Sequence, residues 1–577
     1  MKKIIGIITL VVLLIGGGYM YLRFHVLKAK DYKPVVAKEK NVVDLRPAII
    51  AKLQQLVKDG SAGLYRLNID SINLDIINSK LDVTGASLWI DTATMRLLDK
   101  SQKLSNDLFK LKFNKLHIDG IGVEDLLHKD RIEVTNIEID EPQVVVYHKT
   151  RSYNIEEEKK EKKQPLFQRI LGTMKMIAIG KIDIRHGTFV LHQEGIKGPP
   201  TKLNDLGIVL TKILIDSATQ FDQNRFLFAK TANFSAKNYS LPTPDSLYVF
   251  SVGSVAVSAD KHTMTTENIH LTPKGGKKGF MSKIKTRKEM YDVKIPKLTL
   301  RGVNWWAILN NEKWLSSEVD LYDPNMYVYM DPRVPSSKIF SLNNFPHQRF
   351  LKIPTPISVK KLNLHNFKLA YEEFNPHINR SGTVRFDQLN AQITNVSNIK
   401  TDISLHPIAI ANAQAKFMGV TPIKAKIQFY LNKASTGNFE VDIDVLDTLN
   451  NYTINTVAEP LAQFTIKRGL FLKGTGHIDG DNHGTKAKVA LEYRDLHITP
   501  LRNDSNDNGK LRKHPIISFF ANKLLIKDNN PGANGQLRQP EYTVDRDHHQ
   551  NFFNFIWLTI MTGVLKTIGI PVKLIIK

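Results

Sequence analysis

The chain has 577 residues, 42% hydrophobic and 24% charged, a composition typical of a folded protein of about three or four domains. Its net charge of +24 suits anionic ligands or membrane surfaces. No zinc-finger spacing, basic-helix block or RNP-like motif is present, so nucleic acid is not expected as a partner. The absence of cysteine excludes disulfides, thiolate metal sites and cysteine nucleophiles.

The N-terminus predicts a membrane anchor in residues 1–30. Two lysines precede an uncharged run, Ile4–Leu22, close to the roughly 20 residues that cross a hydrocarbon core. The alternative is a cleaved signal peptide, with Gly16–Gly18 as the small residues at the cleavage site. The apolar character continues through Tyr19–Tyr21, which favours the uncleaved anchor, and either reading exports the rest of the chain. The apolar positions of the anchor are Ile4, Ile8, Val12, Ile15, Tyr19 and Leu22.

Residues 31–65 are expected to form a helical linker, because apolar residues recur three and four apart before Gly60. From Leu64 onward, apolar and polar residues alternate, which predicts strands with one dry and one wet face. In RIEVTNIEID, Arg131–Asp140, two apolar pairs are out of phase, and this predicts a bulge near Thr135 and Asn136.

A long internal repeat organises the middle of the chain. Residues 116–148 align without a gap with residues 298–330, at the offset that separates Pro142 from Pro324. Further pairs of similar sequence segments, upstream and downstream of this alignment, follow in the same order at nearly the same offset. We therefore expect two β repeat units, residues 66–246 and 247–430, and an extended, modular protein.

A C-terminal β region is expected over residues 431–527. Within it, HIDGDNHG superficially resembles a calcium loop. In a loop that starts at Asp479, the twelfth position would be Ala490, where a bidentate carboxylate is required, so a hairpin turn is the better interpretation. No catalytic signature occurs elsewhere in suitable context, so the sequence predicts no catalytic residues, no metal site and no cofactor.

A polar linker, residues 528–550, and an apolar C-terminal helix, residues 551–577, are expected to complete the chain. The apolar run is too short for a comfortable membrane span and too hydrophobic to remain in water. It could lie in a membrane interface, dock on a partner, fill the end of the β structure, or form an ordinary buried helix. Its apolar positions include Phe552, Phe555, Ile556, Trp557 and Ile560.

The fold class predicted is mainly β, with few short helices. Strands with one apolar face need a second layer that buries this face, and so few short helices cannot supply that layer. The sheet must therefore close on itself, pack on a second sheet, or curl around a hydrophobic groove that receives a ligand. The candidate groove-lining residues are Ile118, Ile132, Val134, Ile137, Ile139, Val144, Val146, Ile182, Ile184, Leu300 and Val328.

The pattern of residues 118–154 resembles a known family. It comprises an apolar strand, Gly120, a short helix with Leu126-Leu127, two alternating strands, Glu141-Pro142 and Tyr153-Asn154. This order, after an N-terminal anchor, resembles the AsmA-like proteins of diderm bacteria, although the second copy lacks the Tyr-Asn element. The resemblance implies an elongated, taco-like β-sheet with a hydrophobic groove, anchored in the inner membrane by a single span, with most of the chain in the periplasm.

The function expected on this basis is binding of phospholipid acyl chains in the groove and movement of lipid between the inner and outer membranes. The expected partners are phospholipid or another envelope lipid, the inner membrane, and an outer-membrane or periplasmic partner at the C-terminal end. Two alternatives remain: a structural or assembly factor for the outer membrane that carries no lipid, and, with less support, an exported hydrolase.

Overall fold

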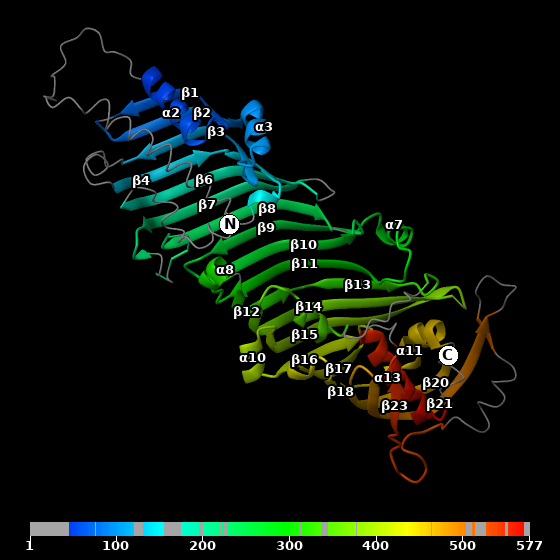
Figure 1. The fold of residues 1–577 in the computed structure, drawn as a ribbon. Helices are drawn as coiled ribbons and strands as arrows, with labels where there is room; N and C mark the ends of the chain where they lie inside the picture. Colours follow the sequence, from blue (N-terminus) through cyan, green and yellow to red (C-terminus); the bar gives the residue numbers. More distant parts are fainter. Residues whose placement is uncertain are drawn as a thin grey trace, which may run out of the picture. The chain divides into compact units, whose positions relative to one another are not determined.

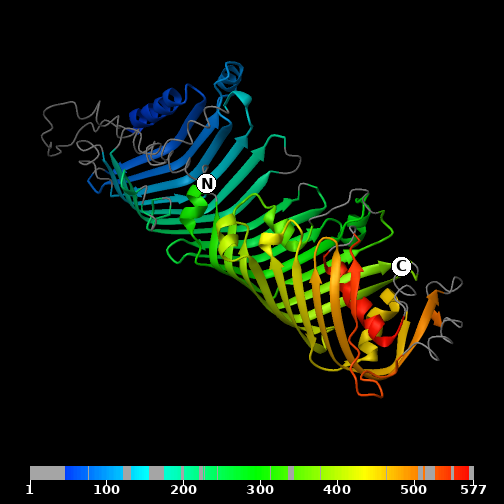
Figure 2. The ribbon, with the colours of Figure 1, turned by 60° about the horizontal axis from the view of Figure 1, so that its bottom comes forward.

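The computed structural model describes residues 46–570, with gaps at 121–130, 155–174, 196–199, 336–343, 504–510, 514–526 and 548–551 and a few shorter ones. The fold is mainly β, and its strands form one large curved sheet (Figures 1 and 2). The chain divides into two compact units, the first reaching residue 241 and including 251–266, the second formed by 242–250 and 267–577. Each unit is described by itself.

Unit 1 begins with a helix that packs on its first strand. Its elements are α2 (Arg46–Gly60), β1 (Tyr65–Asp75), β2 (Lys80–Ile90), α3 (Thr92–Lys100), β3 (Asp107–Asp119), β4 (Arg131–Asp140), β5 (Gln143–His148), the 3₁₀ turn η2 (Ser152–Asn154), β6 (Met176–Gln193) and β7 (Thr201–Ile215). Next come β8 (Thr231–Pro242), β9 (Tyr248–Ser258) and β10 (Thr263–Pro273), which contain the boundary between the units. α2 lies where the helical linker was expected, and it begins at Arg46, the first described residue.

Unit 2 contains long antiparallel hairpins and several short helices. Its elements are α7 (Gly276–Met281), β11 (Met290–Arg301), α8 (Trp305–Asn311), β12 (Trp314–Tyr322), β13 (Asn325–Met330), α9 (Pro346–Leu351), β14 (Ile357–Asn375), β15 (Arg380–Ser397), α10 (Lys400–Leu405), β16 (Ile408–Phe417) and β17 (Thr421–Tyr430). They continue with η4 (Leu431–Lys433), β18 (Phe439–Val445), β19 (Leu449–Asn450), α11 (Asn451–Val457), η5 (Ala458–Ala462), β20 (Phe464–Gly480), β21 (Gly484–Asn503), β22 (Leu511–Lys513), β23 (Glu541–Asp545) and α13 (Phe552–Ile568).

The aligned sequence blocks fold with the same strand topology in both units. In unit 1, β3 pairs antiparallel with β4 and β5, both of these pair parallel with β6, and β6 pairs antiparallel with β7. In unit 2, β11, β12, β13, β14 and β15 repeat these five relations. The register repeats as well, since Leu116 is opposite Ile139 and Leu298 is opposite Leu321.

Residues with left-handed backbone conformations lie side by side in neighbouring strands. Gly120 (φ +66°) donates its N–H to the carbonyl of Ser79 (φ +54°) over 2.9 Å. A Cβ on Gly120 would lie 2.1 Å from Oγ1 of Thr135, and a Cβ on Gly180 would lie 2.4 Å from the Thr135 carbonyl oxygen. On the far side of β6, Lys212 has φ +50°. We call the row formed by Ser79, Gly120, Thr135, Gly180 and Lys212 the first crease; Ser79, Gly120 and Lys212 are its left-handed members.

The bulge predicted near Thr135 and Asn136 falls on the first crease, but the pairing of β4 with β6 has no register shift there. Ile132 and Val134 before it, and Ile137 and Ile139 after it, are all buried although they are out of phase. β4 and β6 stay in step across this point, so both strands change phase at the same level. Irregular residues of this kind bend and twist a sheet, which accounts for its curvature.

The second crease passes through the acidic-proline dipeptides. Glu141 and Asp323 both have left-handed conformations, φ +49° and +50°. Their N–H groups donate to the carbonyls of Arg185 and His365, each over 2.9 Å. The next residues on β6 and β14, His186 and Asn366, are also left-handed, and each strand has a register shift there. The dipeptide therefore ends one short strand and starts the next in the same way in both units.

Three further sequence expectations have different outcomes. The short helix expected at Leu126-Leu127 falls outside the described residues, whereas the aligned segment of the second copy forms α8. Residues 528–550 are not simply a linker: β23 pairs with β21, and Asn530 is fully buried because its side chain bonds the carbonyl oxygens of Leu491 and Arg538. HIDGDNHG does form the expected hairpin turn, between β20 and β21.

Candidate functional site

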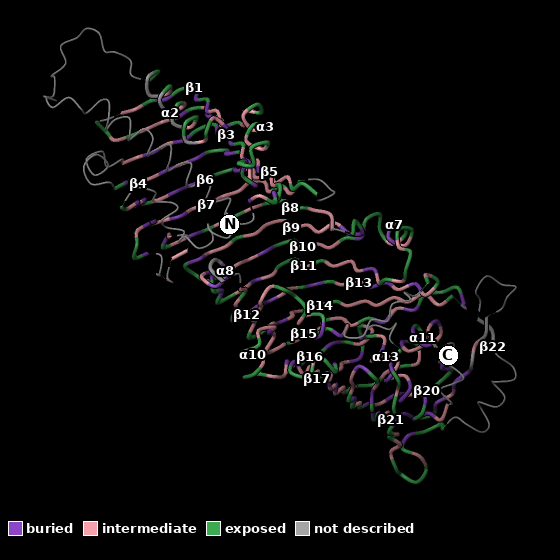
Figure 3. Tube along the Cα trace, viewed as in Figure 1, coloured by how far each residue is buried: buried purple, intermediate pink, exposed green. Residues whose placement is uncertain are grey.

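The apolar face of unit 1 consists of rows of branched aliphatic side chains that cross the strands. Ile118 of β3 is opposite Ile137 of β4, which is opposite Ile182 of β6. A parallel row runs through Leu116 and Ile139. These side chains are at most 4% exposed, and the alternation of buried and less buried positions is visible along the strands in Figure 3. The side chains of these rows are hydrocarbon and carry no hydrogen-bonding groups.

Most candidate groove-lining residues lie on this kind of face. Those of unit 1 are all buried: Ile118, Ile132, Val134, Ile137, Ile139, Val144, Val146, Ile182 and Ile184. In unit 2, Val328 is buried and Leu300 is half-buried. The candidate anchor positions, Ile4 to Leu22, lie outside the described residues. Sequence reasoning missed the β7 members of the rows, Leu210 opposite Ile182 and Ile208 opposite Ile184, although the alternation of that strand could have revealed them.

A longer row crosses unit 2. It begins with Leu300 on β11 and ends with Tyr542 on β23, and each member is the direct cross-strand neighbour of the next. Between these ends it passes through Val319, Leu362, Ile393, Ala411, Ile427, Val441, Ile478 and Ala487. The row has no charged member, so an apolar surface continues across every strand from β11 to β23 that it meets.

The end of this row is covered by α13. The helix lies inside the curve formed by β18, β20, β21 and β23 (Figure 2). Of the apolar positions expected in the C-terminal helix, Phe552 and Phe555 are buried, while Ile556, Trp557 and Ile560 are half-buried. Among the four roles left open by the sequence, α13 therefore fills the concave side of the β structure in unit 2.

An aromatic cluster holds the start of α13. Phe345, just before α9, lies 5.3 Å from Phe552 and 5.4 Å from Phe439 between ring centroids, in edge-to-face geometry. Phe439 and Phe552 are themselves 5.0 Å apart. The guanidinium of Arg546 stacks on the Phe345 ring at 3.9 Å. Such contacts each add to the hydrophobic gain of burial, so they fix the helix in one position.

A polar cluster interrupts the apolar face next to α13. Glu289, just before β11, is hydrogen-bonded by the hydroxyl of Tyr291, and Glu373 of β14 by that of Tyr371 at 3.1 Å. Asn554 of α13 donates to the Glu373 carboxylate over 3.3 Å. Burial raises the pKa of both carboxyl groups, and the charge of Glu289 adds to the increase at Glu373. The alternation pattern gave no signal for this cluster, because it marks glutamates as solvent-facing.

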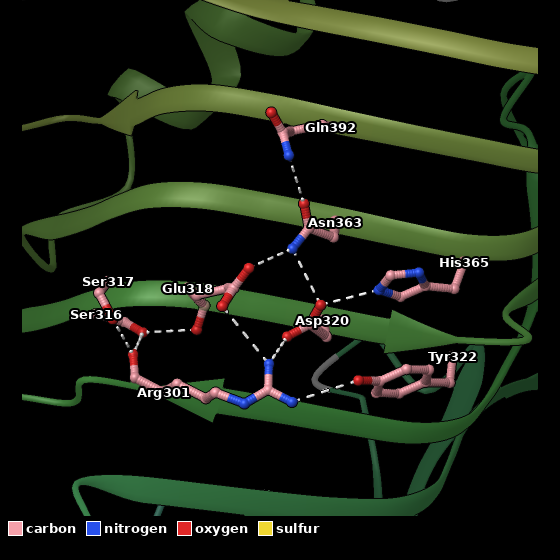
Figure 4. A network of polar contacts seen from close by, with 9 residues as sticks. All are labelled: Arg301, Ser316, Ser317, Glu318, Asp320, Tyr322, Asn363, His365 and Gln392. Carbon is pink, nitrogen blue, oxygen red and sulfur yellow. Dashed lines mark hydrogen bonds and ion pairs between the residues drawn. The ribbon is translucent and has the colours of Figure 1, made fainter.

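The opposite face of unit 2 carries a polar network centred on Asp320 (Figure 4). Asp320, 3% exposed, accepts hydrogen bonds from Asn363 at 3.0 Å, His365 at 2.9 Å and Arg301. Burial alone would raise the pKa of Asp320, but the hydrogen bonds from His365 and Asn363 and the charge of Arg301 lower it below its usual value. Arg301, Asn363 and His365 all form hydrogen bonds with the Asp320 carboxylate, so the network links neighbouring strands and stabilises their pairing.

A related network occupies the equivalent place in unit 1. Asp183 of β6 accepts from Lys181 at 2.8 Å and from Arg185 at 2.7 Å, and Arg185 also lies 3.6 Å from Glu138. Glu138 and Asp320 are equivalent positions of the two repeats, because the same offset separates them as separates Pro142 from Pro324. The polar face of each unit therefore has a buried carboxylate compensated by cations, and neither network leaves a group poised for catalysis.

The remaining polar features of this face also lack the marks of an active site. A hollow of about 560 Å³ between β14 and β18 is walled by polar side chains such as Gln392, Gln414 and Lys424. Histidines pair with aspartates across strands, as His117 does with Asp82 at 2.6 Å. No group of three or more potential ligands in the described part of the chain is arranged to hold a metal ion.

No protein-family profile matches the chain, and no curated protein matches it. Within residues 46–570, apart from the gaps, the structure contains no helix that is both long and apolar enough to span a bilayer. The assignment of function therefore depends on the geometry of the sheet.

Proposed function

We propose that this chain is a lipid-binding protein of the AsmA-like type, which holds acyl chains against the apolar face of its sheet and moves lipid between two membranes. The observation that supports this most is the unbroken sequence of apolar rows across the strands of each unit. In unit 1 these rows contain only aliphatic side chains, from Ile118 through Ile137 to Ile182.

The physical need for such a face is large. Each methylene removed from water contributes about 0.8 kcal/mol, so a sixteen-carbon chain that passes through water meets a barrier of roughly 12 kcal/mol. A continuous apolar row lowers that barrier at every step, while a polar headgroup remains in water at the edge of the sheet. No covalent chemistry is required, which is consistent with polar networks that are internally compensated.

Residues 1–30 anchor the chain in the inner membrane in this proposal, and the units lie in the periplasm of a diderm bacterium. The net charge of +24 supports contact with anionic headgroups. The competing proposal is an outer-membrane assembly factor that carries no lipid. In that case the apolar rows serve only to hold the sheet together.

Adjacent residues of β5 provide a matched test. Val146 is fully buried on the apolar face, and Val145 points to the other face and is half-buried. Full-length chain is extracted without detergent in polymer-bounded lipid discs, exchanged against vesicles, and the bound phospholipid is quantified by mass spectrometry. We expect Val146→Asp to lose most of the bound lipid and Val145→Asp to retain it.

Single-cysteine labelling separates loss of binding from loss of fold, because the native chain has no cysteine. A nitroxide on the acyl chain of an added phospholipid should quench a fluorophore strongly at Leu362→Cys, a half-buried position on the apolar row of unit 2, and weakly at its exposed neighbour Lys361→Cys. Equal quenching at both positions, or none, would support the assembly factor and exclude the lipid-carrying function.

A further inference from the structure

α13 lies on the same apolar row that the proposed function assigns to lipid. The row that starts at Leu300 ends with Val441, Ile478, Ala487 and Tyr542. These last members form one hydrophobic cluster with Phe552 and Phe555 of α13. The helix therefore occupies the continuation of a surface whose earlier part, on β11 to β15, has the same chemistry.

The fit of α13 to the sheet is close at one point. A Cβ on Gly563 would lie 2.3 Å from the hydroxyl oxygen of Tyr542 and 2.7 Å from Cγ2 of Val489. Only glycine allows the helix to approach β21 and β23 to this extent. Tyr542 also donates its hydroxyl to the carbonyl of Thr559 over 2.7 Å.

α13 makes polar contacts along its length, and at its end the Thr567 carbonyl accepts hydrogen bonds from the hydroxyl of Tyr493 at 3.4 Å and from Arg538 at 3.3 Å. Thr559 and Thr485 share a hydrogen bond between their hydroxyls at 3.0 Å, and Asn554 donates to Glu373. None of these is an ion pair of α13, and most of the interface is hydrocarbon against hydrocarbon. An acyl chain offers the same kind of contact to the strands, so the helix and a lipid tail are chemically equivalent occupants.

We propose that the face beneath α13 is an acyl-chain-binding segment that the chain's own helix fills, so that lipid enters it only when α13 leaves. This inference rests on the proposed function and adds an internal competitor to it. With α13 docked, lipid held on the earlier strands of the row stops before β18; with α13 displaced, the row is available as far as β23.

A reversible disulfide between Thr485→Cys and Thr559→Cys tests the proposal in the full-length chain. Their hydroxyl oxygens are 3.0 Å apart, and no native cysteine competes. The chain, in lipid discs, is mixed with phosphatidylethanolamine–phosphatidylglycerol vesicles that contain a phospholipid with a photoreactive acyl chain. After irradiation, mass spectrometry measures the lipid attached to peptides of β18 and β21, with β4 and β6 as internal reference.

The expected result is about ten-fold less labelling of β18 and β21 in the oxidised protein than after reduction, with β4 and β6 unchanged. Gly563→Leu, which prevents close docking, should increase the labelling of β18 and β21 several-fold. The matched control is Thr211→Cys with Thr231→Cys, another pair of threonines whose hydroxyls are hydrogen-bonded across two strands. Its oxidation should leave every peptide unchanged.

The outcomes separate the two ideas. Equal labelling of β18 and β21 in the oxidised and reduced proteins, with β4 and β6 labelled, would overturn the role of α13 and leave the proposed function intact. Absence of label from β4 and β6 in every state would overturn the proposed function, and the inference with it.

Discussion

His347 of α9 should make the docking of α13 sensitive to acid. Its side chain is buried, the residue being 4% exposed, and neither ring nitrogen has a hydrogen-bond partner among the described residues. The ring lies 5.1 Å from that of Phe429 and 6.2 Å from that of Phe345, within the aromatic cluster around Phe552. Burial lowers the pKa of His347 to about 4 from its ordinary value of 6.5. Protonation would bury a cation in the same aromatic cluster whose Phe345 ring already stacks with the Arg546 guanidinium.

The size and sign of the effect follow from the two pKa values. Above pH 6.5 the imidazole is neutral in the folded and unfolded states, and the stability it contributes is complete. As the pH falls below 6.5, the unfolded state takes up the proton first, so stability is lost until the pH reaches about 4. At pH 5 the loss is about 2 kcal/mol.

Native-state hydrogen exchange of α9 and α13 measures this loss locally. Between pH 7.5 and pH 5, corrected for intrinsic exchange rates, the opening free energy of these helices should fall by about 2 kcal/mol more in the wild type than in His347→Phe. His406, which is exposed, provides the matched control, and His406→Phe should behave as the wild type does. Other histidines affect all three proteins equally. An identical pH effect in wild type and His347→Phe would refute the reasoning.

Three further predictions concern the ties between strands. Asp320→Asn should lower the free energy of unfolding of unit 2 by about 1–3 kcal/mol in urea, because Arg301 loses its buried partner, whereas Asp444→Asn, at an exposed site, should change it by less than about 0.5 kcal/mol. Gly302→Ala should lower the free energy of unfolding by about 1–3 kcal/mol in the same assay, because the φ of Gly302 is +61° and a Cβ would lie 2.1 Å from Oγ of Ser317. An unchanged free energy would contradict this close approach. The hydrogen bond that His117 donates to the Asp82 carboxylate raises the pKa of His117, so the stability from this pair is complete below pH 6.5 and lost as the pH rises through the folded pKa. His117→Asn should flatten the pH dependence of β2 and β3 protection in this range.

Alternation and repetition allowed much of the fold to be predicted. The period of two in segments such as Arg131–Asp140 identified strands with one apolar face, and the offset between Pro142 and Pro324 matches two copies of one strand topology. The change of phase at Thr135 was readable from the pairs Ile132/Val134 and Ile137/Ile139, but the bulge predicted from it does not occur as a register shift between β4 and β6. These features are local, so they are encoded in consecutive residues.

Features that depend on distant neighbours were not predictable. The parallel pairing of β4 and β5 with β6 joins segments on either side of residues 155–174, which lie outside the described part of the chain, and alternation alone does not distinguish it from a hairpin. Glu289 and Glu373 occur where the pattern requires solvent, yet burial raises the pKa of both, and Glu373 also contacts Asn554 of α13, which is far away in the sequence. β23 is five residues within a polar segment, and its pairing with β21 provides the stability that its own sequence lacks.

The creases have a consequence for kinetics. Because left-handed residues such as Gly120 and Glu141 bend the backbone itself, the curvature of each unit is a property of the polypeptide and does not depend on a ligand to impose it. Under the proposed function, the apolar face would need little change of shape to receive an acyl chain, so little conformational entropy would be lost on binding. Acyl chains should then bind and leave quickly at every strand, as on a surface along which a ligand diffuses, rather than in a pocket that closes on it.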